Sequence, residues 1–74
     1  MDAESVACAL VARALGIETV QAEDGIHTLG GWDSLGHLAI VTEIEAHTGA
    51  TLSPEQIVSI VSVRDVAQLL SRGD

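Results

Sequence analysis

The sequence contains no lysine, no phenylalanine and no tyrosine, and it has only one cysteine and three arginines among its 74 residues. Nucleic acids and anionic membrane surfaces bind proteins through lysine and arginine, so a chain with a formal net charge of −8 suits neither. The single cysteine, Cys8, excludes an intramolecular disulfide and fits a reducing, cytoplasmic location.

Targeting segments are also missing. The apolar run from Val6 to Leu15 is interrupted by Arg13, and Asp2 and Glu4 stand where a signal peptide is basic. No stretch approaches the roughly 20 apolar residues that a membrane-spanning helix needs. We therefore expect no association with membranes.

The short chain predicts a single domain over residues 1–74. Apolar residues make up 47% of it, enough for one core, and with a single tryptophan as the only aromatic residue that core must be aliphatic. Such a small domain cannot hold both a deep substrate pocket and a set of catalytic residues. A start at Met1 suggests a free-standing protein, although an excised domain would look the same.

Helical periodicity predicts a first helix from about Ala3 to Leu15. Asp2 is placed to cap its N-terminus. Gly16 is placed to end it, with Ile17 packing back against the helix as in a Schellman motif.

A long loop without a clear period follows, over residues 18–33. We expect Ile26 and Leu29 to anchor it to the core. A loop of this length in so short a chain is uncommon unless it has a function.

The second predicted helix starts at Ser34 and runs to about Thr48, with Asp33 as its N-cap and Gly49 as its stop. At about 100° per residue, its main apolar residues fall on one side. They are Leu38, Ile40, Val41 and Ile44. Leu35 falls on the other side, so we expect it to point outward beside Ser34.

A short third helix is predicted to begin at Ser53 and Pro54, and a fourth at Ser62. The run from Ser62 to Asp65 resembles a capping box with Asp in place of the usual Glu. The fourth helix has a regular apolar stripe, made of Val63, Val66, Ala67 and Leu70. The sequence therefore predicts an all-α fold of three longer helices and one short one.

The chemically informative stretch runs from Leu29 to Leu38 and contains a serine, Ser34, where a glycine-rich loop meets a helix. The unpaired N–H groups and the dipole of a helix N-terminus favour an anion there. A phosphodiester on Ser34 would gain about 0.3–1 kcal/mol if exposed. Leu35, pointing outward, would offer a partner enzyme an apolar anchor.

Asp33-Ser34-Leu35 at the start of a second helix resembles the Asp-Ser-Leu signature of acyl carrier proteins. The resemblance extends along the chain through three further segments: Leu15-Gly16-Ile17, Leu29-Gly30 and Ile60-Val61-Ser62-Val63. It implies a small four-helix bundle of the acyl-carrier type, with a long loop between helices one and two and a short third helix.

In that family a phosphopantetheinyl transferase attaches 4′-phosphopantetheine from coenzyme A to the signature serine, which implies covalent attachment at Ser34. The thiol of the arm carries acyl groups as thioesters between enzymes, and the carrier is not itself an enzyme. Asp33 and Leu35 are implied in recognition by the transferase. Glu43 and Glu45 are implied in meeting basic patches on partner enzymes, although acidic residues also keep a small protein soluble.

The resemblance further implies a monomer in a polyketide, fatty-acid or related biosynthetic pathway. Its partners would be an acyl-loading ligase or acyltransferase and a ketosynthase or another acyl-using enzyme. Gly36 departs from the family pattern, where a polar or acidic residue is frequent. Thr48 also departs, because a bulky apolar residue is common at that position.

An enzymatic interpretation would make Ser34 a nucleophile and His37 its base. The hydrolase elbow needs glycine two residues before the serine, where this chain has Trp32, and it needs a preceding strand. Trp32 either lies exposed on a partner surface or covers the core. His37 either lies on the helix surface or approaches the phosphate.

The three histidines, His27, His37 and His47, lack the spacing of metal ligands, so we expect no metal site. Two other carrier-type functions stay open. One is a peptidyl or aminoacyl carrier loaded by an adenylating enzyme, which Leu29-Gly30-Gly31 before the serine also resembles. The other is a carrier-fold scaffold subunit that shuttles nothing.

Overall fold

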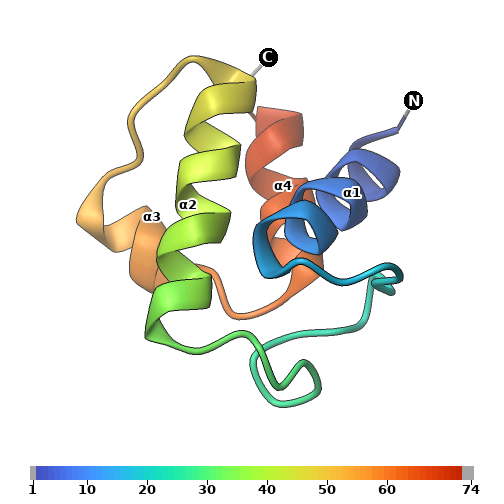
Figure 1. The fold of residues 1–74 in the computed structure, drawn as a ribbon. Helices are drawn as coiled ribbons and strands as arrows, with labels where there is room; N and C mark the ends of the chain where they lie inside the picture. Colours follow the sequence, from blue (N-terminus) through green and yellow to red (C-terminus); the bar gives the residue numbers. More distant parts are fainter. Residues whose placement is uncertain (1, 73–74) are drawn as a thin grey trace.

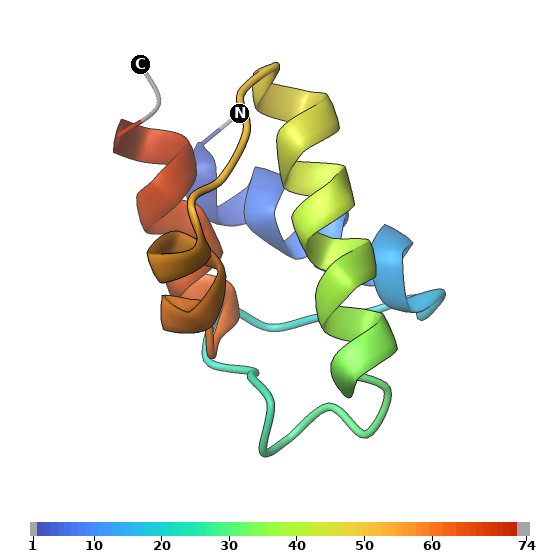
Figure 2. The ribbon, with the colours of Figure 1, turned by 90° about the vertical axis from the view of Figure 1, so that its left-hand side faces the viewer.

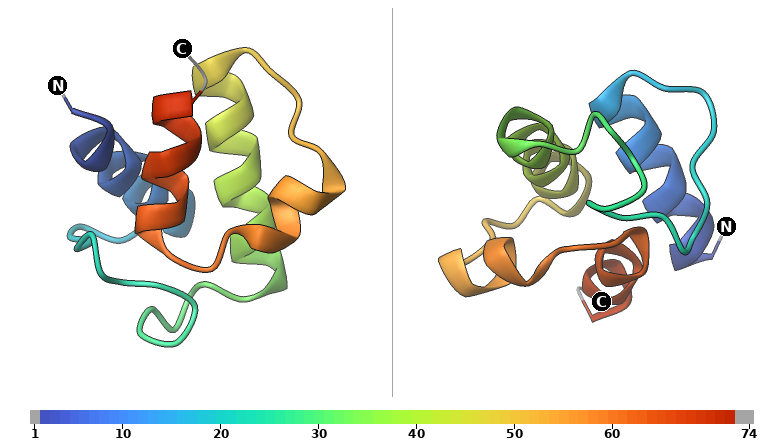
Figure 3. Two further views of the ribbon diagram at one scale, coloured as in Figure 1. Left: turned by 180° about the vertical axis from the view of Figure 1, so that it is seen from behind. Right: turned by 90° about the horizontal axis from the view of Figure 1, so that it is seen from below.

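A computed structural model describes residues 2–72, and within them the chain forms four helices. They are α1 (Ala3–Leu15), α2 (Ser34–Thr48), α3 (Pro54–Ser59) and α4 (Val63–Arg72). Helices α1, α2 and α4 pack around one core, and α3 lies diagonally across the bundle from α1, as the view from below shows (Figures 1 and 3). The predicted all-α fold, with its long first loop and short third helix, is confirmed.

Both predicted ends of α1 are confirmed. The Asp2 carboxylate accepts a hydrogen bond from the Ser5 N–H at 2.8 Å, and this bond lowers the pKa of Asp2. Gly16 adopts the left-handed conformation at φ 68°, which glycine reaches without steric cost. The Ile17 N–H then donates to the Ala12 carbonyl at 3.0 Å, as a Schellman motif requires.

Helix α2 begins and ends as predicted, at the Asp33 cap and at Gly49. Its buried residues are Ile40, Val41 and Ile44. The expectation that Leu38 joins them is wrong, because 59% of Leu38 is exposed. Leu38 stands one turn after Ser34, so the two residues share a face of the helix that turns away from the core.

The two C-terminal helices differ in how they are capped. Ser53 and Gln56 form a complete capping box at α3, although the glutamine was not foreseen. At α4 the Ser62 hydroxyl accepts from the Asp65 N–H at 3.2 Å, as predicted. The Asp65 carboxylate, however, accepts from the Val61 N–H at 2.9 Å. In a capping box this carboxylate would accept from the N–H of the N-cap residue, Ser62, so here it bonds to the residue before the cap.

The loop over residues 16–33 crosses the end of the bundle at which α2 and α4 begin (Figure 2). Its buried anchors are Val20 and Trp32. Leu29 packs half-buried against the core, as expected. The expectation that Ile26 anchors the loop to the core is wrong, because its side chain is exposed. Its backbone N–H donates to the Val61 carbonyl at 3.1 Å.

Asp24 organises this loop and joins it to α4, a role that the sequence pattern did not reveal. Its carboxylate accepts from the Gln21 N–H at 2.9 Å and from the Thr28 hydroxyl at 3.0 Å. Its backbone carbonyl accepts from the Val63 N–H at 2.9 Å. Beside it, Gly25 and Ser62 form an isolated antiparallel bridge.

The core is aliphatic, as predicted, with Trp32 added from the loop. Its largest fully buried side chains are Ile40, Ile44, Ile60, Val11, Val63 and Val66. None of the helices in residues 2–72 is both long enough and apolar enough to cross a membrane.

Candidate functional site around Ser34

Ser34 is the first residue of α2, and its side chain is exposed. The helix is capped by the preceding residue, because Asp33 Oδ1 accepts from the Gly36 N–H at 2.9 Å. Leu35 points outward as predicted and is 78% exposed. The first turn of α2 therefore presents a serine hydroxyl and a large apolar side chain next to each other.

Gly36 is the point at which the loop packs directly onto the first turn of α2. A Cβ atom at this position would overlap the backbone carbonyl oxygen of Gly31 and would lie 2.9 Å from Leu15 Cδ2. The departure from the family pattern at Gly36 therefore has a steric reason. A larger residue would displace the loop that leads into Ser34.

Replacing Gly36 with alanine is expected to destabilise the protein by up to about 2 kcal/mol. Alanine normally gains about 1 kcal/mol over glycine within a helix, but overpacking typically costs about 1–3 kcal/mol, and the clashing carbonyl belongs to the backbone. Urea unfolding followed by circular dichroism measures the difference. Gly30→Ala is the matched control, because a Cβ there meets nothing within 4 Å. Equal stabilities of the two variants would contradict the steric explanation.

His37 lies one turn after Ser34 and bonds through both nitrogens of its ring. Trp32 Nε1–H donates to His37 Nδ1 at 2.9 Å, and His37 Nε2 lies 2.7 Å from the Ile57 carbonyl oxygen. Because the indole N–H can only donate, Nδ1 is the acceptor, so Nε2 bears the hydrogen and donates to Ile57. These bonds fix the tautomer of the ring, which links the loop, α2 and α3.

The structure settles where Trp32 and His37 lie. Trp32 is 5% exposed and belongs to the core, so it covers the core and does not lie open to a partner. His37 is half-buried between the Trp32 ring and α3, with its ring centroid 6.2 Å from that of the indole. Its bond to Ile57 spans 20 residues of sequence, which no local pattern could have predicted.

An open groove of about 600 Å³ runs beside Ser34, between the loop, α2 and α3. Its walls are mostly apolar, and several of their side chains are exposed to solvent. The lining residues are Ile26, Trp32, Asp33, Ser34, His37, Leu38, Val58, Ile60 and Val61. Val58 is 75% exposed and Val61 is 48% exposed, so this face of the molecule is unusually apolar for such an acidic protein.

Glu43 and Glu45 do not lie together with Ser34. Nine residues, or two and a half turns, separate Glu43 from Ser34, which places it on the opposite side of α2. There it lines a small pocket with Arg13 and His47. Glu45 Oε2 accepts from the Leu52 N–H at 2.9 Å and so holds the segment between α2 and α3.

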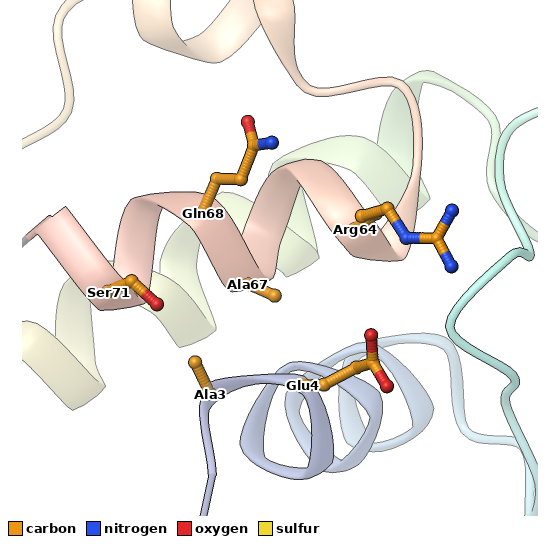
Figure 4. A pocket seen from close by; sticks show the side chains of 6 residues that line it. All are labelled: Ala3, Glu4, Arg64, Ala67, Gln68 and Ser71. Carbon is orange, nitrogen blue, oxygen red and sulfur yellow. The ribbon is translucent and has the colours of Figure 1, made fainter.

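A second groove lies on the surface along the junction of α1 and α4. Figure 4 shows the side chains of Glu4 and Arg64 on its two sides, with their charged groups toward one another. None of the predicted site residues lines it. Residues 2–72 contain no group of three or more side chains arranged to hold a metal ion. Burial and nearby carboxylates raise the pKa of the Cys8 thiol, which disfavours a reactive thiolate.

A comparison with protein-family models matches residues 5–70 to the family described as "Phosphopantetheine attachment site". The match covers most of the chain, so the protein belongs to this family of carrier proteins. It is a phosphopantetheine-bearing carrier domain, not a catalyst, and a phosphopantetheinyl transferase and pathway enzymes are its partners. Searches of curated proteins and of solved structures returned no match.

Proposed function

We propose that Ser34 is the residue to which 4′-phosphopantetheine is attached. Its exposure at the first position of α2 carries this assignment, because a transferase must reach the hydroxyl. Asp33 already caps the helix, which leaves the serine hydroxyl available. The N–H groups and dipole of the helix start favour the charge of a phosphodiester.

The residues around Ser34 fit such a group. The groove is open at its edge and has room for a flexible arm. When bound, the group supplies a thiol that carries acyl chains as thioesters. The protein contributes a fixed attachment point and a surface on which partner enzymes can dock.

The proposed function is that of an acyl carrier, formed by a single domain over residues 1–74, in polyketide, fatty-acid or related biosynthesis. An acyl-loading ligase or acyltransferase would load it, and a ketosynthase or another acyl-using enzyme would unload it. Asp33 and Leu35 are proposed to contact the transferase, which their exposure beside Ser34 supports. A monomeric state and a cytoplasmic location complete the proposal.

The partner roles of Glu43 and Glu45 remain predictions. Glu43 faces away from Ser34, and the Glu45 carboxylate already accepts an internal hydrogen bond. The surface next to Ser34 offers apolar side chains, above all Leu35, Leu38 and Val58. Apolar contacts are therefore expected to contribute more to docking at this end of α2 than pairing of these two carboxylates with basic patches.

The apolar surroundings of Ser34 support a second candidate function, a peptidyl or aminoacyl carrier loaded by an adenylating enzyme. A carrier that depends on basic partner patches would gain from acidic side chains around its serine. Here the exposed side chains of the groove are mainly apolar. A scaffold that shuttles nothing is the third alternative, and it requires no function of Ser34.

Loading assays separate these alternatives. The protein is first converted to its phosphopantetheine form with coenzyme A and a promiscuous transferase. It is then incubated with ATP and either fatty acids and an acyl-loading ligase or amino acids and adenylating enzymes. Intact-protein mass spectrometry is expected to show acyl loading. Aminoacyl loading alone would favour the second function, and cellular activity retained in Ser34→Ala would favour the scaffold.

A further inference from the structure

Helix α3 forms one wall of the groove beside Ser34, and it is held mainly at its ends, by the buried Ile60 after it and by the bond from Leu52 to Glu45 before it. It has only six residues, and none of them is buried. It makes no extensive contact with another helix, whereas α1 packs closely on both α4 and α2. Such a short helix depends on specific contacts for its position, because its intrinsic stability is negligible.

The bond from His37 Nε2–H to the Ile57 carbonyl is a direct polar link between α2 and α3 near Ser34. Ile57 lies in the last turn of α3, and its carbonyl also accepts a longer hydrogen bond from the Ile60 N–H at 3.4 Å. The other nitrogen of the same ring is fixed by Trp32, which is buried in the core. The imidazole therefore links the last turn of α3 to the buried core.

We propose that His37 is a positioning residue that sets where α3 lies relative to Ser34, and so determines how well the modifying transferase docks. This inference rests on the proposed function of Ser34. The wall that His37 positions bears Val58 and Val61, which are exposed and line the groove together with Ser34 and Leu38. A partner that reaches Ser34 along this groove meets both walls.

The expected effect follows from a population argument. Without the link to Ile57, α3 occupies its docking-competent position only part of the time. The apparent affinity for the transferase equals the intrinsic affinity multiplied by the fraction of time that α3 spends in this position. The transferase KM for the carrier therefore rises, while kcat stays the same, because the bound complex contains the same serine in the same place.

Two conservative variants separate the two bonds of the ring. Asparagine places its carbonyl oxygen near the position of Nδ1, so His37→Asn keeps an acceptor for Trp32 but cannot reach Ile57. Glutamine places its amide nitrogen near Nε2, so His37→Gln keeps a donor for Ile57. His47→Asn is the matched control, because His47 is an exposed histidine near the other end of α2.

The test measures KM and kcat of a phosphopantetheinyl transferase for each variant, with circular dichroism to verify helix content. We expect KM to rise about tenfold in His37→Asn, as for the loss of one bond to a half-buried carbonyl, with kcat unchanged. His37→Gln and His47→Asn should keep a KM close to that of the wild type. Fluorescence reports on Trp32 alone, because the chain has one Trp and no Tyr. The fluorescence emission of Trp32 should change more in His37→Gln than in His37→Asn, because only the asparagine keeps an acceptor for the indole N–H.

An unchanged KM in His37→Asn, with the wild type modified normally, would overturn this inference and leave the proposed function intact. A lower kcat at constant KM would also overturn it, since it would indicate a role in the reaction instead of in docking. Equal rises in KM for His37→Asn and His37→Gln would overturn the assignment to α3 and implicate the bond to Trp32. A wild type that gains no phosphopantetheine would overturn the proposed function and this inference together.

Discussion

Replacing Ser34 with alanine is expected to abolish phosphopantetheinylation completely. Transfer from coenzyme A forms a bond from the serine oxygen to phosphorus and releases adenosine 3′,5′-bisphosphate, and alanine has no oxygen to form it. Intact-protein mass spectrometry after incubation with coenzyme A and a transferase should show one added phosphopantetheinyl group on the wild type and none on the variant.

The loss must come from the missing hydroxyl and not from misfolding. Ser34 is exposed and Asp33 caps α2, so Ser34→Ala should change the free energy of unfolding by no more than about 0.5 kcal/mol. Ser5→Ala, at an exposed serine on α1, should be modified like the wild type. If Ser34→Ala were modified to the same extent as the wild type, the attachment site would have to be another residue.

Both ends of α1 and α2 and the start of α3 were predictable because they depend on local chemistry. Asp2, Asp33 and Ser53 each cap a helix through an N–H group three residues later. Gly16 and Gly49 end helices by adopting a positive φ, which glycine does without steric cost. Interactions over three to five residues can be inferred from sequence, since the chain itself brings the partners together.

The arrangement around Ser34 was less predictable because it depends on contacts between distant segments. The spacing of about 100° per residue groups Leu38 with the buried residues of α2, but 59% of Leu38 is exposed and it lines the groove. His37 gives no local sign that its partner is Ile57. The family signature therefore indicated the candidate serine, whereas the groove and the bonds of His37 required a three-dimensional structure.

Replacing Ile40 with alanine is expected to cause a large loss of stability. Ile40 is fully buried in the core at the centre of α2, and deleting such a side chain typically costs about 2–5 kcal/mol. A domain of 74 residues has roughly 4–11 kcal/mol of stability in total, at about 0.05–0.15 kcal/mol per residue. Thermal unfolding followed by circular dichroism should show a Tm lower by at least about 8 °C.

Leu35→Ala is the matched control on the same helix, five residues earlier in the chain. Its side chain is 78% exposed, so its truncation should change stability by no more than about 0.5 kcal/mol. The same change is expected to raise the transferase KM about fivefold or more, as for an apolar anchor worth more than about 1 kcal/mol in an interface. A loss of stability in Leu35→Ala comparable to that in Ile40→Ala would show that Leu35 serves the core. The two variants thus separate folding from docking within α2, because its inward face holds the bundle together and its outward face is free to meet partners.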